Sequence, residues 1–489
     1  MICLPVAVAV QYLIYQCEGE KMQIPIINGI YTDNTGNYRT FYPENMIPVP
    51  TSNGISAGYL RPGYGITEFG TGPGTGRGGI NWNNVCYRVM GDYFVKVNQD
   101  GTTTTIGTVG GSGQVTLDYS FDYLGVNADN KLFLYDGTTL TQITDSDLGT
   151  VLDFVWLDGY FVCTDGEFIV VTELNNPFSV NPTKYGSSEI DPDPIVGVEE
   201  IRNELIAINR YSIEFFDNIG GTGFPFQRIE GAQIQRGAVG THAYCIFAER
   251  LAFVGSGRNE PNAVWLAYNG STQKLSTREI DKILKNYTET QLSEITMQNK
   301  YDENNNQILI NLPDKTLVYD INASQSVSQP VWYVLHSGLG YGVISQYKGH
   351  NFVWCYDKWL CEDPTSNKHG YLVDDISSHY GTEVSWEFGT TIVYNDSKGA
   401  IFHELELVAN TGNVALGDDP KIFTQYSVDG LNWSTPRGIK SGKQGVRNKK
   451  LVWLQQGNMR DRRIQKFYGT SNSHLSFARL DARMEPLYV

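Results

Sequence analysis

The chain has 489 residues, of which 53 are acidic and 37 basic, so its formal net charge is −16. This charge excludes nucleic-acid binding by the molecule as a whole through bulk electrostatics. Charged residues make up only 18%, while 51 glycines and 12% aromatic residues are typical of strands and tight turns. The seven cysteines are scattered, and none has the short, duplicated spacing of a zinc site. We therefore expect reduced cysteines, and neither a metal nor another cofactor.

The first 21 residues are predicted to be a non-native N-terminal extension. They are apolar but short for a membrane span, and Pro5 and Gln11 interrupt them. The basic start of a secretory signal is missing, although a signal peptide stays the alternative. Met22 is the predicted natural start, because the following residues open like the first strand of a soluble domain.

Residues 22–75 are predicted to form an N-terminal arm with little regular structure, because Pro, Gly and Thr are frequent from Ser52 onward. The glycines between residues 70 and 79 invite comparison with a phosphate-binding loop. Such a loop needs Gly-Lys-Ser/Thr opening a helix, and that pattern is absent. We interpret this stretch as a flexible loop.

Residues 151–174 show most plainly a pattern that recurs along the chain. Three runs of aromatic and β-branched residues are separated by Asp158-Gly159 and Asp165-Gly166. Asp-Gly supplies the positive φ angles of a tight hairpin turn. The stretch therefore predicts three short antiparallel strands in a row.

Variants of this pattern recur at a spacing of roughly 40 to 50 residues, the period of propeller blades and similar arrays. One such meander cannot bury both of its faces, and radial stacking solves this with only short exposed edges. The sequence predicts an all-β fold, with a β-propeller of six or seven blades over residues 76–378. A set of ordinary β-sandwiches is the alternative. The recurrences lie at 85–101, 123–137, 195–218, 243–257, 304–322 and 342–360.

A helical insertion is predicted at residues 275–293. Ser276 is followed three residues later by Glu279, which is the pattern of a capping box. Ile280, Ile283 and Leu284 then fall on one helical face. The helix either covers the propeller between two blades or contacts a neighbouring subunit.

Residues 379–489 are predicted to form a separate C-terminal antiparallel β-sandwich, because several runs alternate in period two with longer links. Between Arg437 and Lys466 there are ten basic residues and one acid, Asp461. Such a segment fits an acidic partner surface or phosphate, or it is a solvated strand face. The candidate partner-binding residues are Lys449, Lys450, Trp453, Arg460, Arg462, Arg463 and Lys466.

No catalytic constellation can be recognised. The seven histidines are dispersed, and neither a His-Glu-x-x-His motif nor a Gly-x-Ser-x-Gly nucleophile elbow is present. The paired carboxylates occupy turn-like positions, where Asp bonds its own backbone. We therefore expect no enzyme and no small-molecule substrate.

Several stretches resemble the tail hub proteins of short-tailed bacteriophages of the Salmonella-phage type, also called packaged-DNA stabilisation proteins or tail accessory factors. Each match is short, but together they keep their order over about residues 22–489, and the family has nothing like residues 1–21. The similar runs are GYLRPGYGIT (58–67), RGGINWNNVCYRVMGDYFVKV (77–97), GSGQVTL (111–117), IEFFDN (213–218), REIDKILKNYT (278–288), TLVYD (316–320), QPVWYVLHSGL (329–339), DISSHY (375–380) and VWLQQGNMRDRRIQKF (452–467).

The resemblance implies a homo-hexameric hub in the virion, assembled in the host cytoplasm. It implies attachment below the portal and its adaptor protein, closure of the DNA channel, and anchoring of the tail needle and tailspikes. Contact with packaged DNA in the channel is a further implication. The alternatives are a glycan-binding or glycan-cleaving propeller and a secreted adhesin.

Overall fold

The computed structural model describes residues 21–487 apart from 25, 27–41, 52–54, 269, 303–304, 340–344, 396–397, 415, 430–431 and 471–474. The predicted extension of residues 1–21 lies outside the described residues except for Lys21. The chain divides into two compact units. Residues 66–321 and 346–372 form one, called here the propeller unit, and residues 1–65, 322–345 and 373–489 form the other, the sandwich unit.

The described part of the propeller unit contains seven antiparallel sheets, which run in chain order and have three to five strands each within the unit. Their orders are β5-β6-β7-β8, β12-β11-β10-β9, β13-β14-β15-β16, β17-β18-β19-β20, β21-β23-β24-β25 with β22, β26-β27-β28, and β30-β31-β32-β4. The strands are β4 (Gly65–Thr71), β5 (Gly76–Trp82), β6 (Val85–Met90), β7 (Tyr93–Val97), β8 (Thr103–Thr108), β9 (Thr116–Tyr119), β10 (Leu124–Ala128), β11 (Lys131–Tyr135), β12 (Leu140–Gln142), β13 (Asp153–Leu157), β14 (Tyr160–Thr164), β15 (Phe168–Glu173), β16 (Asn176–Ser187), β17 (Ile195–Ile201), β18 (Glu204–Asn209), β19 (Ile213–Asn218), β20 (Phe226–Arg228), β21 (Gly237–Ala238), β22 (Tyr244–Ile246), β23 (Leu251–Ser256), β24 (Ala263–Tyr268), β25 (Ser271–Lys274), β26 (Thr296–Asp302), β27 (Asn305–Asn311), β28 (Thr316–Asp320), β30 (His350–Cys355), β31 (Lys358–Glu362) and β32 (Lys368–Val373).

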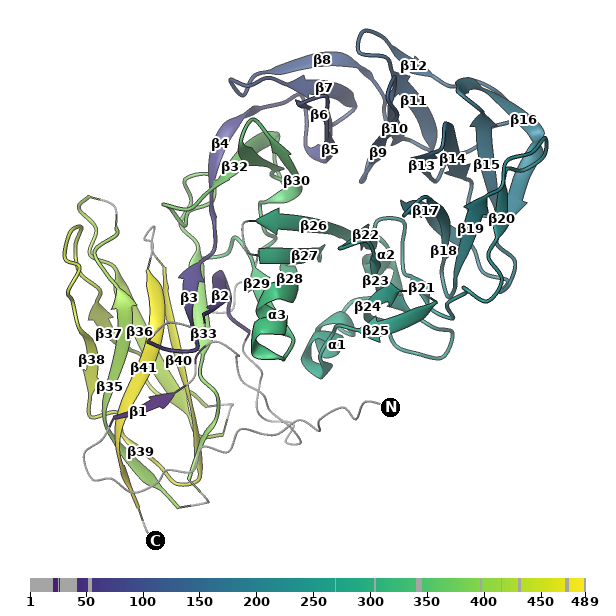
Figure 1. Cartoon of the computed structure of the whole chain (residues 1–489). Helices are drawn as coiled ribbons and strands as arrows, with labels where there is room; N and C mark the ends of the chain where they lie inside the picture. The colour runs from purple at the N-terminus through teal and green to yellow at the C-terminus, as the bar shows by residue number, and fades with distance from the viewer. Residues whose placement is uncertain are drawn as a thin grey trace. The chain divides into compact units, whose positions relative to one another are not determined.

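These sheets are arranged as the blades of a ring (Figure 1). The first strands β5, β9, β13 and β17 contact one another in turn, β18 contacts β21 of the fifth blade, and β22, β26 and β30 lead back to β5. The ring confirms the predicted β-propeller, with seven blades among the described residues.

The hairpin turns follow the sequence pattern. Leu157 pairs with Tyr160, so only Asp158 and Gly159 connect β13 to β14. Their φ angles of 51° and 89° are those a two-residue hairpin turn requires. The strands on either side bury Phe154, Phe161 and their neighbours between blades.

The last blade is completed by a strand from the beginning of the propeller unit. β4 pairs with β32, although the two are separated by the whole ring in sequence. The amide N–H of Gly72, just after β4, donates to the carbonyl of Asn367 at 2.8 Å. Closure of this kind ties the two ends of the ring together and leaves fewer free edges.

An ion pair joins the first and last blades at the same place. Arg88 of β6 and Glu362 of β31 are both fully buried, with Nη1 and Oε1 3.2 Å apart. Arg88 also donates to the carbonyl of Asn351, whose side-chain amide donates to the other oxygen of Glu362. Gly76 must be glycine here, because a Cβ would lie 2.2 Å from the Glu362 carboxyl carbon.

A second buried carboxylate connects four blades near the axis. Asp153 of β13 accepts hydrogen bonds from the Thr116 hydroxyl at 2.6 Å, the Val198 amide at 3.0 Å and the Tyr244 hydroxyl. These donors lie on β9, β17 and β22. Burial raises the pKa of Asp153 to about 6 despite the three donors.

The predicted helical insertion is two short helices, α1 (Arg278–Leu284) and α2 (Glu289–Ser293). The capping box expected at Ser276 is wrong, because Thr277 is the N-cap of α1 and accepts from the Ile280 amide. A capping box is instead formed by Thr288 and Gln291 at α2. A third helix, α3 (Ile321–Val327), was not predicted.

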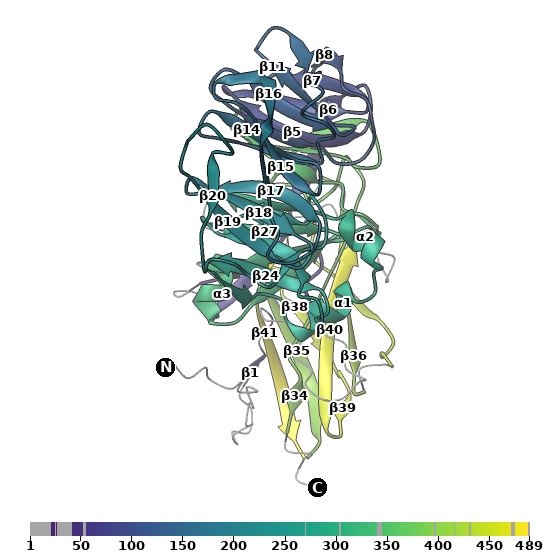
Figure 2. The same cartoon turned by 90° about the vertical axis from the view of Figure 1, so that its right-hand side faces the viewer.

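The sandwich unit has two antiparallel sheets whose long strands β35, β36, β40 and β41 are aligned lengthwise (Figure 2). Their orders are β2-β3-β41-β35-β38, with β1 and β39 at the side, and β33-β40-β36-β37, with β34. Trp386 and Phe388 of the second sheet pack on Phe477 of the first at ring distances of 5.0 and 5.1 Å. The elements are β1 (Lys21–Ile24), β2 (Met46–Pro50), β3 (Gly58–Pro62), β29 (Val331–Leu335), β33 (Ser385–Gly389), β34 (Val393–Tyr394), β35 (Ala400–Asn410), β36 (Lys421–Ser427), β37 (Arg437–Lys440), β38 (Leu451–Leu454), β39 (Asn458–Met459), β40 (Arg462–Thr470) and β41 (Ser476–Pro486).

Much of the described part of segment 22–75, expected to be an arm, is in strands. β1, β2 and β3 extend a sandwich sheet, and Met46, Ile47 and Leu60 are buried there. The proline-rich sequence concealed these strands, since proline is confined to particular positions in a sheet. The predicted domain boundaries stay a prediction.

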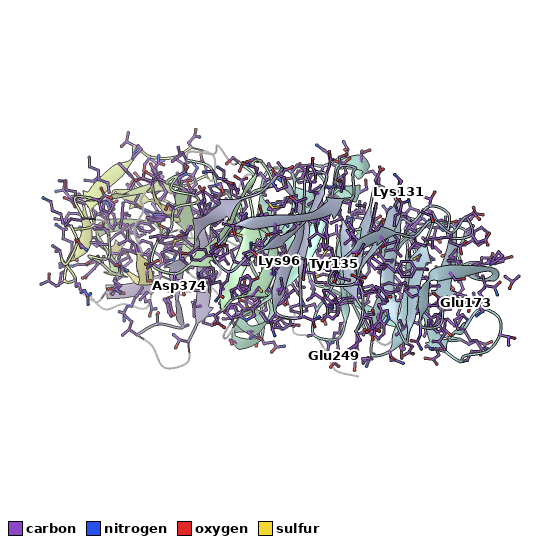
Figure 3. The ribbon with its side chains drawn as sticks, turned by 90° about the horizontal axis from the view of Figure 1, so that it is seen from above. Lys96, Lys131, Tyr135, Glu173, Glu249 and Asp374 are labelled. Carbon is purple, nitrogen blue, oxygen red and sulfur yellow. The ribbon has the colours of Figure 1, made fainter. Side chains whose placement is uncertain are left out.

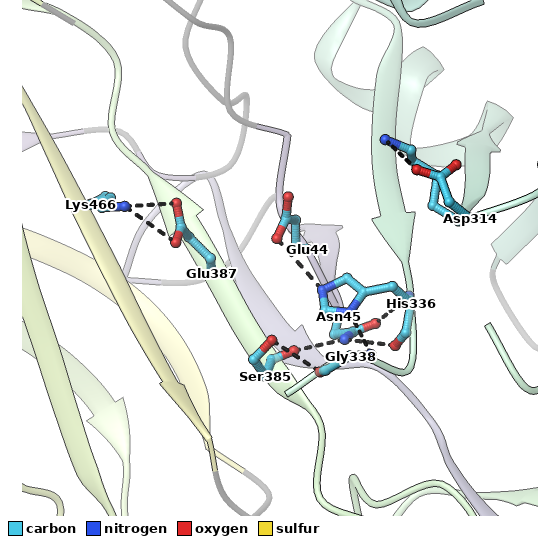
Figure 4. A network of polar contacts seen from close by, with 9 residues as sticks. Glu44, Asn45, Asp314, His336, Gly338, Ser385, Glu387 and Lys466 are labelled. Carbon is cyan, nitrogen blue, oxygen red and sulfur yellow. Dashed lines mark hydrogen bonds and ion pairs between the residues drawn. The ribbon is translucent and has the colours of Figure 1, made fainter. Parts of the chain in front are cut away.

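Asn45 fixes this segment to two others of the sandwich unit (Figure 4). Its side-chain amide donates to the carbonyls of His336 and Ser385 at 3.0 and 2.7 Å, and its oxygen accepts from the His336 amide. Asn45 has a φ of 52°, in the left-handed region that asparagine tolerates better than most residues. The network holds residues 43–45, 334–338 and 385–387 together within the unit.

We predict that Arg88→Leu destabilises the propeller unit by about 3–5 kcal/mol, because it leaves the Glu362 carboxylate buried and unpaired. The double variant Arg88→Leu with Glu362→Leu recovers most of this loss, since no charge is left without a partner. Urea denaturation followed by tryptophan fluorescence measures both. Equal destabilisation by the single and double variants would contradict the prediction that the stability is lost because Glu362 is left unpaired.

Asp153→Asn tests the second carboxylate. The raised pKa means that the folded state binds more protons than the unfolded state between about pH 4 and 6. The protonated carboxyl group of Asp153 therefore stabilises the folded state at pH values below the pKa it has in the unfolded state. This stability is lost as the pH rises through about 6, the pKa in the folded state. The asparagine oxygen can accept from Val198 and Tyr244, while its amide donates to Thr116. We expect the stability of the variant relative to the wild type to rise by up to about 3 kcal/mol between pH 4 and 7.5, and a pH-independent difference would refute this.

Candidate functional site: the basic segment of the sandwich

The basic segment of residues 437–466 lies in the sandwich unit. It comprises β37, a loop to β38, the short strand β39 and the start of β40. β37 is the outer strand of one sheet, and β38 is the outer strand of the other. The segment therefore follows the edges of both sheets, where side chains are accessible to a partner.

The loop of residues 441–450, called here the basic loop, carries four exposed cations. Lys443, Arg447, Lys449 and Lys450 have exposed side chains, and none forms an ion pair with a described residue. The loop is held in place from within the unit. The Thr411 hydroxyl donates to the Val446 carbonyl at 2.9 Å, and the Gly445 amide donates to the Gly412 carbonyl at 2.9 Å.

Trp453, predicted to bind a partner, lies instead in the hydrophobic core. It is 3% exposed and packs on Phe467 at a ring distance of 5.4 Å. Its indole N–H donates to the carbonyl of Arg437 at 3.0 Å. The tryptophan is buried because it occupies an inward position of β38, which the neighbouring charges concealed in the sequence.

Arg463 is also buried, at 1% exposure. Its guanidinium carbon lies 4.1 Å from the ring of Phe402 and 3.9 Å from the ring of Tyr426. It donates to the Gln456 carbonyl at 2.7 Å and to the Gln465 side-chain oxygen. Burial lowers the pKa of Arg463 to about 9. The prediction that Arg463 binds a partner is therefore wrong, because its side chain is buried and stabilises the interior of the sandwich.

The remaining candidates lie at or near the surface. Arg460 is exposed, Arg462 forms an ion pair of 3.4 Å with Asp461, and Lys466 lies 3.4 Å from Glu387 (Figure 4). Burial raises the pKa of Glu387, and the ammonium group of Lys466 opposes that rise. With Lys449 and Lys450, these residues keep the partner-binding role as a prediction.

Sequence reasoning missed the apolar part of this surface. Val446 in the basic loop is 40% exposed, and Leu454 at the end of β38 is 60% exposed. The exposure of Leu454 could have been predicted from the alternation of side chains along β38. Because Trp453 points into the core, the next residue, Leu454, must point outward.

Among the described residues, no group of three or more His, Cys, Asp or Glu side chains is placed to hold a metal ion. The same residues include no helix with the length and apolar character needed to cross a membrane.

A seven-bladed β-propeller combined with a β-sandwich in one chain defines a two-module β-protein. A family model described as "Bacteriophage P22 Gp10, beta-propeller" matches residues 22–377, and a second, "Bacteriophage P22 Gp10, beta-sandwich", matches residues 385–485. The chain belongs to the bacteriophage P22 Gp10 family. It is 28% identical over 462 residues to the tail hub protein gp10 of Salmonella phage P22, covering 90% of this chain and 94% of that protein.

Solved structures of other proteins are less similar. PorZ of Porphyromonas gingivalis has a TM-score of 0.35 and 9% identity, covering 62% of this chain and 39% of that chain. BamB from Moraxella catarrhalis has a TM-score of 0.37 and 11% identity, covering 72% of this chain and 98% of that chain.

We predict that Arg463→Glu unfolds the sandwich, losing about 3 kcal/mol or more, because it puts a carboxylate among neutral partners. Arg460→Glu changes stability by about 0.5 kcal/mol or less, because this side chain is exposed. Thermal unfolding of both variants measures the contrast. Equal melting temperatures for the two would show that Arg463 is at the surface.

Proposed function

We propose that this chain is the hub subunit of a short bacteriophage tail, attached below the portal and its adaptor protein. Membership of the Gp10 family makes it a structural protein of the virion tail, which assembles with other tail components. The finer proposal is a homo-hexamer, assembled in the host cytoplasm, that closes the DNA channel and anchors the tail needle and tailspikes. We further propose that it catalyses no reaction.

The proposal is supported most strongly by how much of the chain matches the Gp10 family. Both modules match the family, and 94% of the P22 tail hub protein is covered. A protein that shared only a propeller would share a scaffold on which many functions are built. Here the combination of both modules is shared over nearly the whole length of the two proteins.

The charge distribution supports attachment through the sandwich. The propeller unit has 20 basic and 36 acidic residues, and the sandwich unit has 17 of each. The whole net charge of −16 therefore belongs to the propeller unit. An acidic surface on a ring-shaped partner, or the phosphates of DNA, would be attracted to the basic segment and repelled by the propeller unit.

Reversal of Arg460 and Arg462 tests this attachment. We expect Arg460→Glu with Arg462→Glu to leave the protein folded but to reduce its incorporation into tails at least tenfold, with loss of packaged DNA. Particle-bound protein and nuclease-resistant DNA are measured after assembly in infected cells. Lys421→Glu with Arg483→Glu is the matched control, because both side chains are exposed on the same unit outside the basic segment.

Normal incorporation and normal DNA retention by the double variant would show that these two residues only face solvent. A loss of retention with normal incorporation would favour direct contact with DNA. That contact would weaken steeply with salt, because each neutralised phosphate releases counterions.

A further inference from the structure

The contact between the first and last blades, called here the closing contact, contains a row of three titratable side chains. His350 of β30, Glu362 of β31 and His369 of β32 are opposite one another on neighbouring strands, so their side chains lie on one face of the blade. All three are buried. Arg88 of the first blade faces the middle of this row, with Nη1 3.2 Å from Oε1 of Glu362. We call the three residues the histidine–glutamate row.

Hydrogen bonding fixes His369 as a neutral imidazole. Its Nε2 lies 3.1 Å from the carbonyl oxygen of Gly101, in the β7–β8 turn of the first blade. A carbonyl oxygen can only accept, so the imidazole proton is on Nε2 and Nδ1 carries none. Among the described residues, none bonds to Nδ1 of His369 or to Nε2 of His350, and both atoms are shielded from solvent. A second proton on the His369 ring would therefore be a buried, charged donor without an acceptor.

The carboxylates around the row are already paired with other cations. The pairs are Arg88 with Glu362 at 3.2 Å, Lys368 with Glu68 at 2.6 Å and Lys348 with Asp363 at 3.9 Å. A further cation, Lys358, lies 5.2 Å from the ring of Phe69 in β4. A protonated histidine would add a positive charge that none of these carboxylates is free to balance.

The two histidines are accordingly hard to protonate in the folded protein. Burial lowers the pKa of both His350 and His369 from 6.5 to about 4, and the charge of Arg88 adds to this effect at His369. Between pH 6.5 and 4, the closed contact therefore binds fewer protons than an opened, hydrated one. The stability that results is present above pH 6.5 and is lost as the pH falls toward 4.

His369 lies where three segments of the ring meet. Phe69 of β4 packs edge-on against its imidazole at a ring distance of 5.9 Å. The next residue, Gly70, approaches so closely that a Cβ would lie 2.0 Å from the carbonyl oxygen of Gly101 and 3.0 Å from the His369 ring. A charged imidazole can gain hydration only if β4, the last blade and the first blade move apart.

The other side of the first blade is built from groups that do not respond to acid. There Tyr87 and Phe94 pack on Tyr135 of the second blade, each at a ring distance of 5.6 Å. In Figure 3, Tyr135 and Lys96, the cross-strand partner of Tyr87, lie next to each other at this contact. Burial raises the pKa of Tyr87 to about 12, so it stays neutral at low pH. Farther round the ring, Asp153 stabilises the folded state as the pH falls, because its pKa is about 6.

We infer that the histidine–glutamate row is an acid-operated latch of the propeller. Proton uptake by His350 and His369 opens the closing contact and releases β4, while the other blades stay folded. A return to neutral pH closes the ring again, because no covalent bond is made or broken. The inference goes beyond the proposed function and does not depend on it.

Hydrogen exchange of the wild-type protein at pH 7.5 and pH 4.5 tests the latch. The rates are corrected for the pH dependence of exchange in unstructured peptides, which leaves the opening constant of each segment. At pH 4.5, the opening constants of residues 66–71 and 359–372 are expected to be roughly 70-fold higher for each histidine that takes up a proton. Residues 153–173 of the third blade are expected to stay protected.

Glutamine variants identify the groups that respond. His369→Gln keeps an amide that can donate to Gly101 but does not titrate, and His350→Gln removes the second titrating ring. Each is expected to reduce the acid response of residues 66–71 roughly 70-fold, and the double variant to abolish it. His242→Gln is the matched control, because burial also lowers the pKa of His242 to about 4 but this residue lies before β22, in the fifth blade. It is expected to keep the full response.

An unchanged opening constant for residues 66–71 at pH 4.5 would overturn the inference. Equal loss of protection at residues 153–173 would do the same, because the protein would then unfold as a whole. A full acid response in the double variant would show that other groups are responsible. Exchange at the C2 position of the imidazole rings, followed by mass spectrometry, measures both pKa values in the wild type without any substitution. Values near 6.5 for His350 and His369 would also contradict the latch.

Discussion

The propeller depends on how its ring is closed, because each blade buries its faces only against two neighbours. The strand β4 completes the last blade from the N-terminal side, and Arg88 and Glu362 pair in the dry interior between the first and last blades. The pair contributes little as net attraction, since taking two charges out of water costs several kcal/mol per ion. It specifies instead which two blades meet, because any other neighbour would leave each charge without a partner.

Charge is divided between the modules in a way that fits a component of an assembly. All of the net negative charge lies in the propeller unit, while the sandwich unit is neutral and has exposed cations in its basic loop. A soluble monomer gains nothing from this division. In an assembly, it favours contacts between unlike surfaces and disfavours contacts between two propellers or two basic loops.

Local patterns in the sequence were sufficient for the architecture. Asp158-Gly159 predicted its hairpin because only a few residue types adopt two successive positive φ angles. The period of the repeats predicted the propeller, and the family models confirm both modules. The completion of the last blade could not be predicted, because β4 and β32 pair across segments too distant for any local pattern to reveal.

The candidate site was predicted only in part, since sequence alone does not show which way a side chain points. Arg463 and Trp453 stand among exposed cations in the sequence but face the sandwich core, where aromatic rings surround the guanidinium of Arg463. The helix cap at Thr277 differs by one residue from the predicted Ser276, because both residue types serve as caps. Strands β2 and β3 were missed because they alternate around prolines.

Hydrogen exchange of the native protein tests the closed ring most directly. If β4 completes the last blade, its amide hydrogens are exchanged only through the same opening as those of β31 and β32. The account predicts equal opening free energies for residues 66–71 and 359–372, and a common loss of protection in Arg88→Leu. Rapid exchange of residues 66–71 while the last blade stays protected would contradict the account, because the ring would then be closed without its N-terminal strand.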